Sequence, residues 1–195
     1  RLRKIRALSN IFNPLFNYYK KSLHNNGNRL IIKTFDFLKT HDSHQFKQPQ
    51  TLSSSINQLY ALVSHNYWNY FHATSHKLSV PLIDNVIHDM KSYTTLTANG
   101  AKIYLYSGHD TSVMTIISAV CKIFDAETIF NIEDWPDYNS YVSLELWCDE
   151  NKENSCYIRC VFNDNESKFL SLQQFITLFN ERKLEPLQVG GINEF

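Results

Sequence analysis

Apolar residues recur at helical spacing through the first half of the chain, residues 1–95. Breaks of turn-forming or polar residues fall at 25–28, 41–50 and 79–81, so the pattern predicts four helices joined by short links. The stripes that define these helices are Leu2, Ile5, Leu8, Phe12 and Leu15; Ile31, Phe35 and Leu38; Ile56, Leu59, Leu62 and Val63; and Ile83, Val86, Ile87 and Met90.

The pattern changes after Gly100. A short β-favouring run at 103–106 is followed by a tight turn and an apolar helical run at 113–120, which predicts strand, turn and buried helix. Alternation over 141–147 and a second β-like run at 157–162 predict an antiparallel pair, and a stripe over 172–179 predicts a closing helix. We therefore expect an α/β fold, with a helical cap over residues 1–97 and part of an α/β core over 98–195.

The composition is that of a globular protein. The chain has 195 residues, 43% of them hydrophobic, and no apolar run near the roughly 20 residues that a membrane span needs. Residues 1–83 carry a net charge of +9 and residues 84–195 a net charge of −9. The basic half could attract anionic ligands, or the two halves could neutralise each other on one surface. No nucleic-acid recognition motif accompanies the basic residues, so we expect no nucleic-acid partner.

The opening segment, residues 1–23, is rich in Arg and Lys and holds no acidic residue. That composition is compatible with a mitochondrial transit peptide, and a basic surface helix interrupted by Pro14 explains the same residues.

The four cysteines all lie in the second half. Cys148 and Cys156 flank a turn-like run and could face each other across a hairpin, whereas Cys156 and Cys160 lie about 13 Å apart along a strand, too far to bridge. A disulfide is left open at this point. No Cys and His spacing matches a zinc site, so no structural metal is expected.

The stretch 107–111, Ser-Gly-His-Asp-Thr, carries the candidate chemistry. It would lie at the carboxyl end of a strand, where the free N–H groups of the following helix suit a phosphate. His109 could donate a hydrogen bond to a phosphoryl oxygen, and Asp110 could deliver a proton to the departing alkoxide. The alternative is structural: Asp110 or Thr111 would only cap the helix.

Residues 104–113, Tyr-Leu-Tyr-Ser-Gly-His-Asp-Thr-Ser-Val, resemble the histidine–aspartate motif of the histidine acid phosphatases, within the histidine phosphatase superfamily. Residues 137–147 are similar to the Pro-Tyr-Ala-Ser segment and the Glu-Leu-Trp strand of that family, with Asp137 in place of the usual Pro. The helical half, at 35–49 and 71–90, is similar more loosely to the family's helical insert, and the resemblance covers roughly residues 35–195.

The resemblance implies an α/β domain with a helical cap that hydrolyses phosphomonoesters through a phosphohistidine, with no metal or other cofactor. It assigns His109 to binding the phosphoryl group and Asp110 to proton donation. The family's nucleophile lies in an Arg-His-Gly-x-Arg-x-Pro motif, and this sequence holds no Arg-His pair. We therefore expect a C-terminal portion with an incomplete sheet, inactive alone, whose missing N-terminal portion supplies the nucleophile.

Two functions remain open. The full-length protein could be an acid phosphatase acting on small phosphomonoesters, or a catalytically inactive binding or assembly module. Family likeness favours a secretory, lysosomal or extracellular location, and Asn165-Glu166-Ser167 is a glycosylation acceptor pattern. The other seven histidines lie in the helical half and are expected on the surface or in packing, with His72 the one to consider as a cap residue near the substrate.

Overall fold

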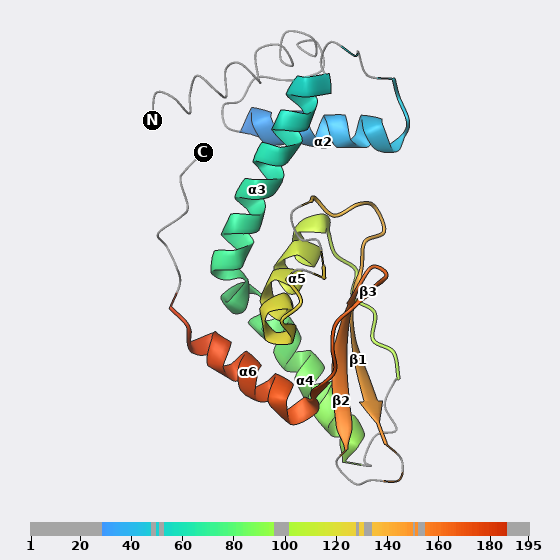
Figure 1. Ribbon diagram of the computed structural model, residues 1–195, viewed down its shortest axis with the longest axis vertical. Coiled ribbons are helices and arrows are strands. Elements are labelled where there is room, and N and C mark those ends of the chain that lie inside the picture. The colour runs from blue at the N-terminus through green and yellow to red at the C-terminus, as the bar shows by residue number, and fades with distance from the viewer. Residues whose placement is uncertain are drawn as a thin grey trace. The chain divides into compact units, whose positions relative to one another are not determined.

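The computed structural model describes residues 29–47, 50, 53–95, 102–127, 129–130, 134–149, 151 and 155–186 (Figure 1). The first predicted helix, the basic opening segment and His24 lie outside the described residues. The chain forms two compact units, one that ends at Tyr67 and one that begins at Trp68. The predicted boundary between cap and core near residue 97 stays a prediction.

The first unit contains α2, Arg29–Ser43, and the beginning of α3, Ser53–Leu78. The stripe predicted for α2 is confirmed where its side chains are described, because Phe35 and Leu38 are buried. The rings of Phe35 and Tyr60 meet edge to face at 5.4 Å, and the Tyr60 hydroxyl donates to Asp42 Oδ2 at 2.6 Å. These contacts pack α2 against the first turns of α3.

The second unit begins with the end of α3 and continues into α4, Val80–Thr94. The predicted break falls at Ser79, whose N–H donates to the Ser75 carbonyl at 2.9 Å. Pro81 then occupies the first turn of α4, where its missing N–H costs no intrahelical bond. Ile83, Ile87 and Met90 are buried, as the periodicity predicts, along one face of α4.

The predicted antiparallel pair is present as β1, Val142–Cys148, and β2, Cys156–Phe162. Val142 lies opposite Phe162 and Cys148 opposite Cys156, so the alternating apolar residues of β1 share a face with Ile158, Cys160 and Phe162. Two short strands, β3 (Asn165–Glu166) and β4 (Leu170–Ser171), also pair with β2.

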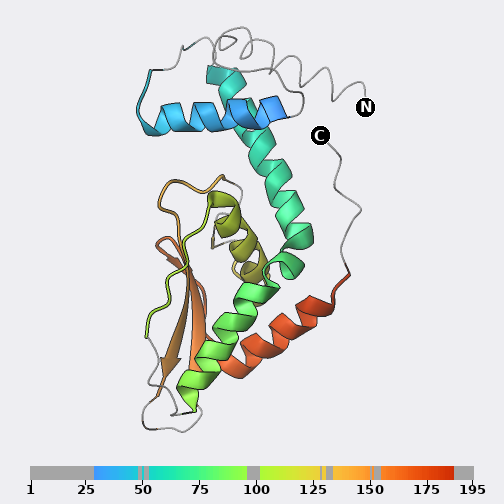
Figure 2. The same ribbon diagram turned by 180° about the vertical axis from the view of Figure 1, so that it is seen from behind.

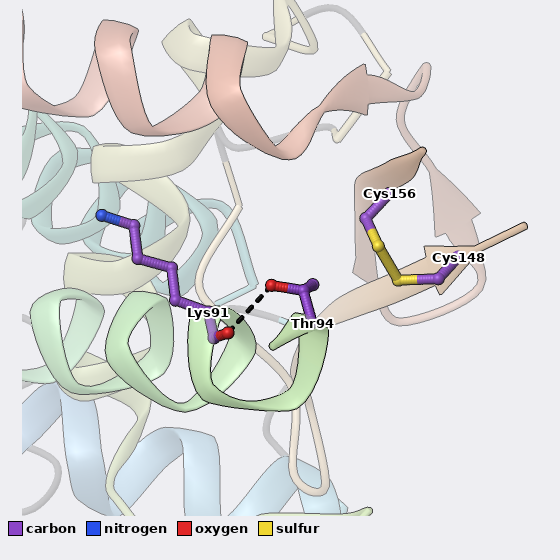
Figure 3. Close-up of a disulfide and its surroundings, with 4 residues drawn as sticks. All are labelled: Lys91, Thr94, Cys148 and Cys156. Carbon is purple, nitrogen blue, oxygen red and sulfur yellow. Dashed lines mark hydrogen bonds between the residues drawn. A yellow bond between two sulfur atoms is a disulfide. The ribbon is translucent and has the colours of Figure 1, made fainter. Parts of the chain in front are cut away.

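A disulfide closes this hairpin. Cys148 and Cys156 are bonded to each other, which answers the question that the sequence left open (Figure 3). The two residues are the last register pair of the ladder, so the bridge joins positions that the strands already bring together.

Two helices cover the apolar face of the sheet: α5, Asp110–Phe124, and α6, Leu172–Leu184. Both contact β2, and Figures 1 and 2 show them on the same side of the hairpin. The ring of Phe175 lies 5.5 Å from that of Phe124 and 6.3 Å from that of Phe179, and all three side chains are fully buried. Burial of each such ring contributes about 2–3 kcal/mol. This cluster is the core that fixes α5, and with it the candidate site.

The opposite face of the sheet is polar and aromatic. The Arg159 guanidinium lies 5.3 Å from the Trp147 ring centroid and 5.5 Å from that of Phe169. Glu145 accepts from Arg159 Nε at 2.8 Å, and Glu166 accepts from the same guanidinium. The Arg159 guanidinium therefore has two carboxylate partners on the exposed side of the hairpin.

Residues 103–106 differ from the prediction. The chain is extended there, but no backbone hydrogen bond joins it to another part of the chain that the structure describes. Ile103 is 76% exposed and Leu105 91%. A strand requires a neighbour to take its backbone hydrogen bonds, and the described residues provide none. The fold class itself is confirmed, with five described helices and an antiparallel sheet that does not close.

Candidate active site

The candidate site lies where α5 begins. His109 is the residue before the helix, and its backbone is extended, with a φ of −101° and a ψ of 171°. Asp110 is the first helical residue. The His109 carbonyl accepts from the N–H groups of Ser112 at 2.9 Å and Val113 at 3.1 Å. Ser112 Oγ in turn accepts from the His109 N–H at 3.3 Å. His109 and Ser112 are therefore joined by two hydrogen bonds, one in each direction, across the first turn.

Gly108 is required here by space. A Cβ at this position would lie 2.9 Å from Ser112 Cβ and 3.1 Å from Ser112 Oγ. Real Cβ atoms essentially never come closer than 3.0 Å to a non-bonded heavy atom, so any side chain would displace Ser112. Glycine thus lets the chain pass close to the helix and keeps the capping contact of Ser112.

Both oxygens of the Asp110 carboxylate accept hydrogen bonds. Oδ1 accepts from the Thr111 N–H at 2.7 Å, and Oδ2 accepts from Trp135 Nε1 at 2.7 Å. Asp110 is exposed, so the carboxylate is held in place and is still accessible from solvent. Such a carboxyl group can exchange a proton with a bound ligand.

His109 lies beside that carboxylate in sequence and is also exposed. The positive end of the α5 dipole and the first N–H groups of the helix favour an anion at this end. An imidazole N–H here can add a hydrogen bond to a phosphoryl oxygen. The structure therefore places the two predicted site residues together at one helix terminus, where a phosphate could be bound.

His72 is placed elsewhere. Burial lowers the pKa of its imidazole, Lys122 and Arg182 lower it further, and Glu127 acts in the opposite direction. Lys122 is in the last turn of α5, about 18 Å along the helix from Asp110. His72 thus lies near the end of α5 that is opposite the candidate site. Its Nδ1 is buried without a hydrogen-bond partner among the described residues.

Trp135 was missed by sequence reasoning. It lies in an irregular stretch, Asp134-Trp135-Pro136, that has no periodicity to place it. The local signal for Trp135 is its position between Asp134 and Pro136, directly before the segment at 137–147 that resembles the family. Trp68 Nε1 donates to the Asp134 carbonyl at 2.9 Å, which links this stretch to α3.

A shallow hollow of about 320 Å³ is lined by residues of β4 and α6 and includes neither His109 nor Asp110. Among the described residues, no group of three His, Cys, Asp or Glu side chains could hold a metal ion. None of the described helices combines the length and apolar content that a membrane crossing needs.

The family model for the histidine phosphatase superfamily, branch 2, matches residues 3–163. The chain belongs to this superfamily. The match includes both segments that carry the resemblance, 104–113 and 137–147. It begins upstream of residue 35, where the resemblance was expected to start, and it ends before α6.

One curated relative is Counting factor 60 of Dictyostelium discoideum, which is 27% identical over 130 residues. The alignment covers 62% of this chain and 27% of that protein, so the chain spans about a quarter of the relative's length. No solved structure matches the chain. Superfamily membership suggests a phosphatase-like function.

Proposed function

We propose that the full-length protein is an acid phosphatase that hydrolyses small phosphomonoesters through a phosphohistidine, without a metal or other cofactor. The observation that carries the proposal is the Asp110 carboxylate, held by two hydrogen bonds beside His109 at the N-terminus of α5.

In this proposal the phosphoryl oxygens lie over the first turn of α5 and accept a hydrogen bond from His109. A histidine nucleophile forms the N–P bond while the P–O bond to the leaving group breaks. Asp110 transfers its proton to the departing alkoxide, so the alcohol leaves neutral. Water then attacks the phosphorus while the N–P bond breaks, and Asp110 takes up a proton from the water, so the products are inorganic phosphate, the free histidine and the reprotonated carboxyl group.

The nucleophile comes from another segment of the same protein, because this sequence holds no Arg-His pair. The exposed residues 103–106 support this part of the proposal. Tyr104 is 50% exposed and Tyr106 56%, in an extended stretch that precedes the site directly. A strand from the same segment would cover these side chains and pair with their backbone. Alone, the chain described here would be inactive.

The alternative is a catalytically inactive member that acts as a binding or assembly module. The same exposed apolar stretch favours it, since exposed apolar surface marks interaction sites in general. The matched relative bears the name of a counting factor rather than of an enzyme. Hydrolysis by the intact protein separates the two functions.

We place the protein in the secretory pathway, in lysosomes or outside the cell. Two features support this location. The Cys148–Cys156 disulfide is a bond that persists in oxidising compartments. Asn165 of the acceptor pattern is exposed on β3, where a glycan could be accommodated.

The test compares two variants of the full-length protein with the same charge change at the two ends of α5. Asp110→Asn removes the proton donor, whereas Asp125→Asn changes an exposed residue just after the helix, where the φ of 54° suits asparagine. We expect Asp110→Asn to lower turnover of an alkyl phosphate about 10²–10⁴-fold. Asp125→Asn should leave that turnover unchanged.

A second measurement traps the intermediate. Rapid quenching with ³²P-labelled substrate should give a phosphoprotein that is stable in alkali and labile in acid, as a phosphohistidine is. An intact protein that hydrolyses no phosphomonoester, or an Asp110→Asn variant with unchanged turnover, would contradict the proposal.

A further inference from the structure

The Asp110 carboxylate is held from two different parts of the chain. The Thr111 N–H belongs to the same helical turn, whereas the Trp135 indole comes from a stretch 25 residues away. The terminal torsion of an aspartate is broad, so one local hydrogen bond leaves the carboxyl plane free to rotate. A second donor to the other oxygen, from a separate segment, fixes that plane.

The donor is itself anchored. Trp68, 4% exposed on α3, donates its indole N–H to the Asp134 carbonyl at 2.9 Å. Pro136 follows Trp135 directly and is buried, and its ring fixes its own backbone φ. A buried tryptophan on one side and a buried proline on the other therefore hold Trp135 in position.

We propose that Trp135 is a positioning residue that sets the orientation of the Asp110 carboxyl group for proton transfer to the leaving group. This inference rests on the proposed function. Of the four lone pairs of the carboxylate, the two hydrogen bonds occupy one on each oxygen, which leaves one on each to carry the transferred proton. Proton transfer requires the acid within about 2.6–3.2 Å of the leaving oxygen. A freely rotating carboxyl group meets that condition only part of the time.

The kinetic test uses Trp135→Phe in the full-length protein, which keeps an aromatic ring and removes only the N–H donor. For glycerol 2-phosphate, whose alkoxide needs the proton, we expect kcat/KM to fall about 10–100-fold, as for a group misplaced by up to 1 Å. For p-nitrophenyl phosphate, whose leaving group departs without a proton, we expect a change of less than about threefold. Competitive inhibition by inorganic phosphate should not change.

The matched control is Trp147→Phe. Trp147 Nε1 donates to Glu145 Oε2 at 3.1 Å, so this variant removes the same kind of indole-to-carboxylate bond on the sheet. Both substrates should keep their wild-type kcat/KM. Trp68→Phe, which removes the anchor of Asp134, should give a smaller loss that again affects only the alkyl phosphate.

The hydrogen bond can also be observed without activity. In protein labelled with ¹⁵N-tryptophan, the indole resonance of Trp135 is the one that Trp135→Phe removes. Asp110→Asn should shift this resonance and leave that of Trp147 in place. If the Trp135 resonance does not move in Asp110→Asn, the inference is overturned, because the hydrogen bond is then absent.

The kinetic outcomes separate this inference from the proposed function. An active wild type in which Trp135→Phe loses equal activity on both substrates, or none, would overturn the positioning role and leave the phosphatase proposal standing. An inactive wild type whose Trp135 resonance responds to Asp110→Asn would overturn the phosphatase proposal, and the positioning role with it.

Discussion

Gly108 offers a direct test of the site geometry, because its substitution introduces a single atom at a known place. In Gly108→Ala the new Cβ would lie 2.9 Å from Ser112 Cβ, whereas ordinary contact begins at 3.4 Å. The two residues must therefore move apart by about 0.5 Å. That movement separates Ser112 Oγ from the His109 N–H and shifts the start of α5.

The cost follows from two opposing effects. Overpacking of this kind costs about 1–3 kcal/mol. Alanine in place of glycine recovers about 0.4–1 kcal/mol, because it restricts the unfolded chain. We expect a net loss of roughly 0.5–2 kcal/mol in the free energy of unfolding. Since a 1 Å misplacement costs about 10²-fold in rate, a shift of half that size predicts about a tenfold loss on alkyl phosphates.

The assay is a double-mutant cycle with Ser112→Gly, measured by denaturant unfolding and by kcat/KM of the full-length protein. Ser112→Gly removes both atoms that the new Cβ would meet, so in that background Gly108→Ala should raise the free energy of unfolding by about 0.4–1 kcal/mol. The coupling free energy should then be about 1–3 kcal/mol. Additivity within about 0.5 kcal/mol would refute the steric argument.

Three further predictions concern the same unit. His109→Ala should weaken competitive inhibition by phosphate and vanadate about tenfold or more, since a hydrogen bond to a charged group contributes about 1.5–3 kcal/mol; unaltered inhibition in an active protein would refute the phosphate site. Replacing Cys148 and Cys156 together by Ser should lower the free energy of unfolding by about 2–3 kcal/mol, because the unfolded chain regains the entropy of a loop that spans 8 residues. Equal denaturant midpoints of the two proteins would argue against the disulfide. Burial raises the pKa of Cys121 to about 11 and that of Cys160 further still, so neither thiol should react with iodoacetamide at pH 8 until the protein unfolds; peptide mass spectrometry before and after denaturation checks this.

Local pattern was sufficient to predict the hairpin and the helices around it. The apolar residues Val142, Leu144 and Leu146 alternate with polar ones, a pattern that can be recognised from neighbouring positions alone. In the structure these three residues lie opposite Phe162, Cys160 and Ile158, on one face of the hairpin. Chain geometry excluded a Cys156–Cys160 disulfide and allowed Cys148–Cys156, but only the register of the strands decides that the latter two residues meet.

Residues 103–106 show where local pattern is insufficient. Their β-favouring side chains predicted a strand, yet a strand is defined by hydrogen bonds to another segment. The described residues offer no such segment, so the same side chains stand exposed in an extended chain. Composition therefore indicated the preferred backbone conformation correctly and could not supply the partner.

The arrangement around Asp110 combines a local and a tertiary cause. Gly108, His109 and Ser112 lie within five positions of one another, so the turn that presents the carboxylate could be predicted from the sequence as an extended run, a glycine and a helix start. The orientation of that carboxylate depends on Trp135, which reaches it only because the folded core holds the intervening chain in place. A motif can therefore identify the proposed acid, whereas the residue proposed to orient it lies in a loop without periodicity. For the same reason, relatives that keep the motif could differ in how well they protonate a poor leaving group, and the residue at the position of Trp135 would decide the difference.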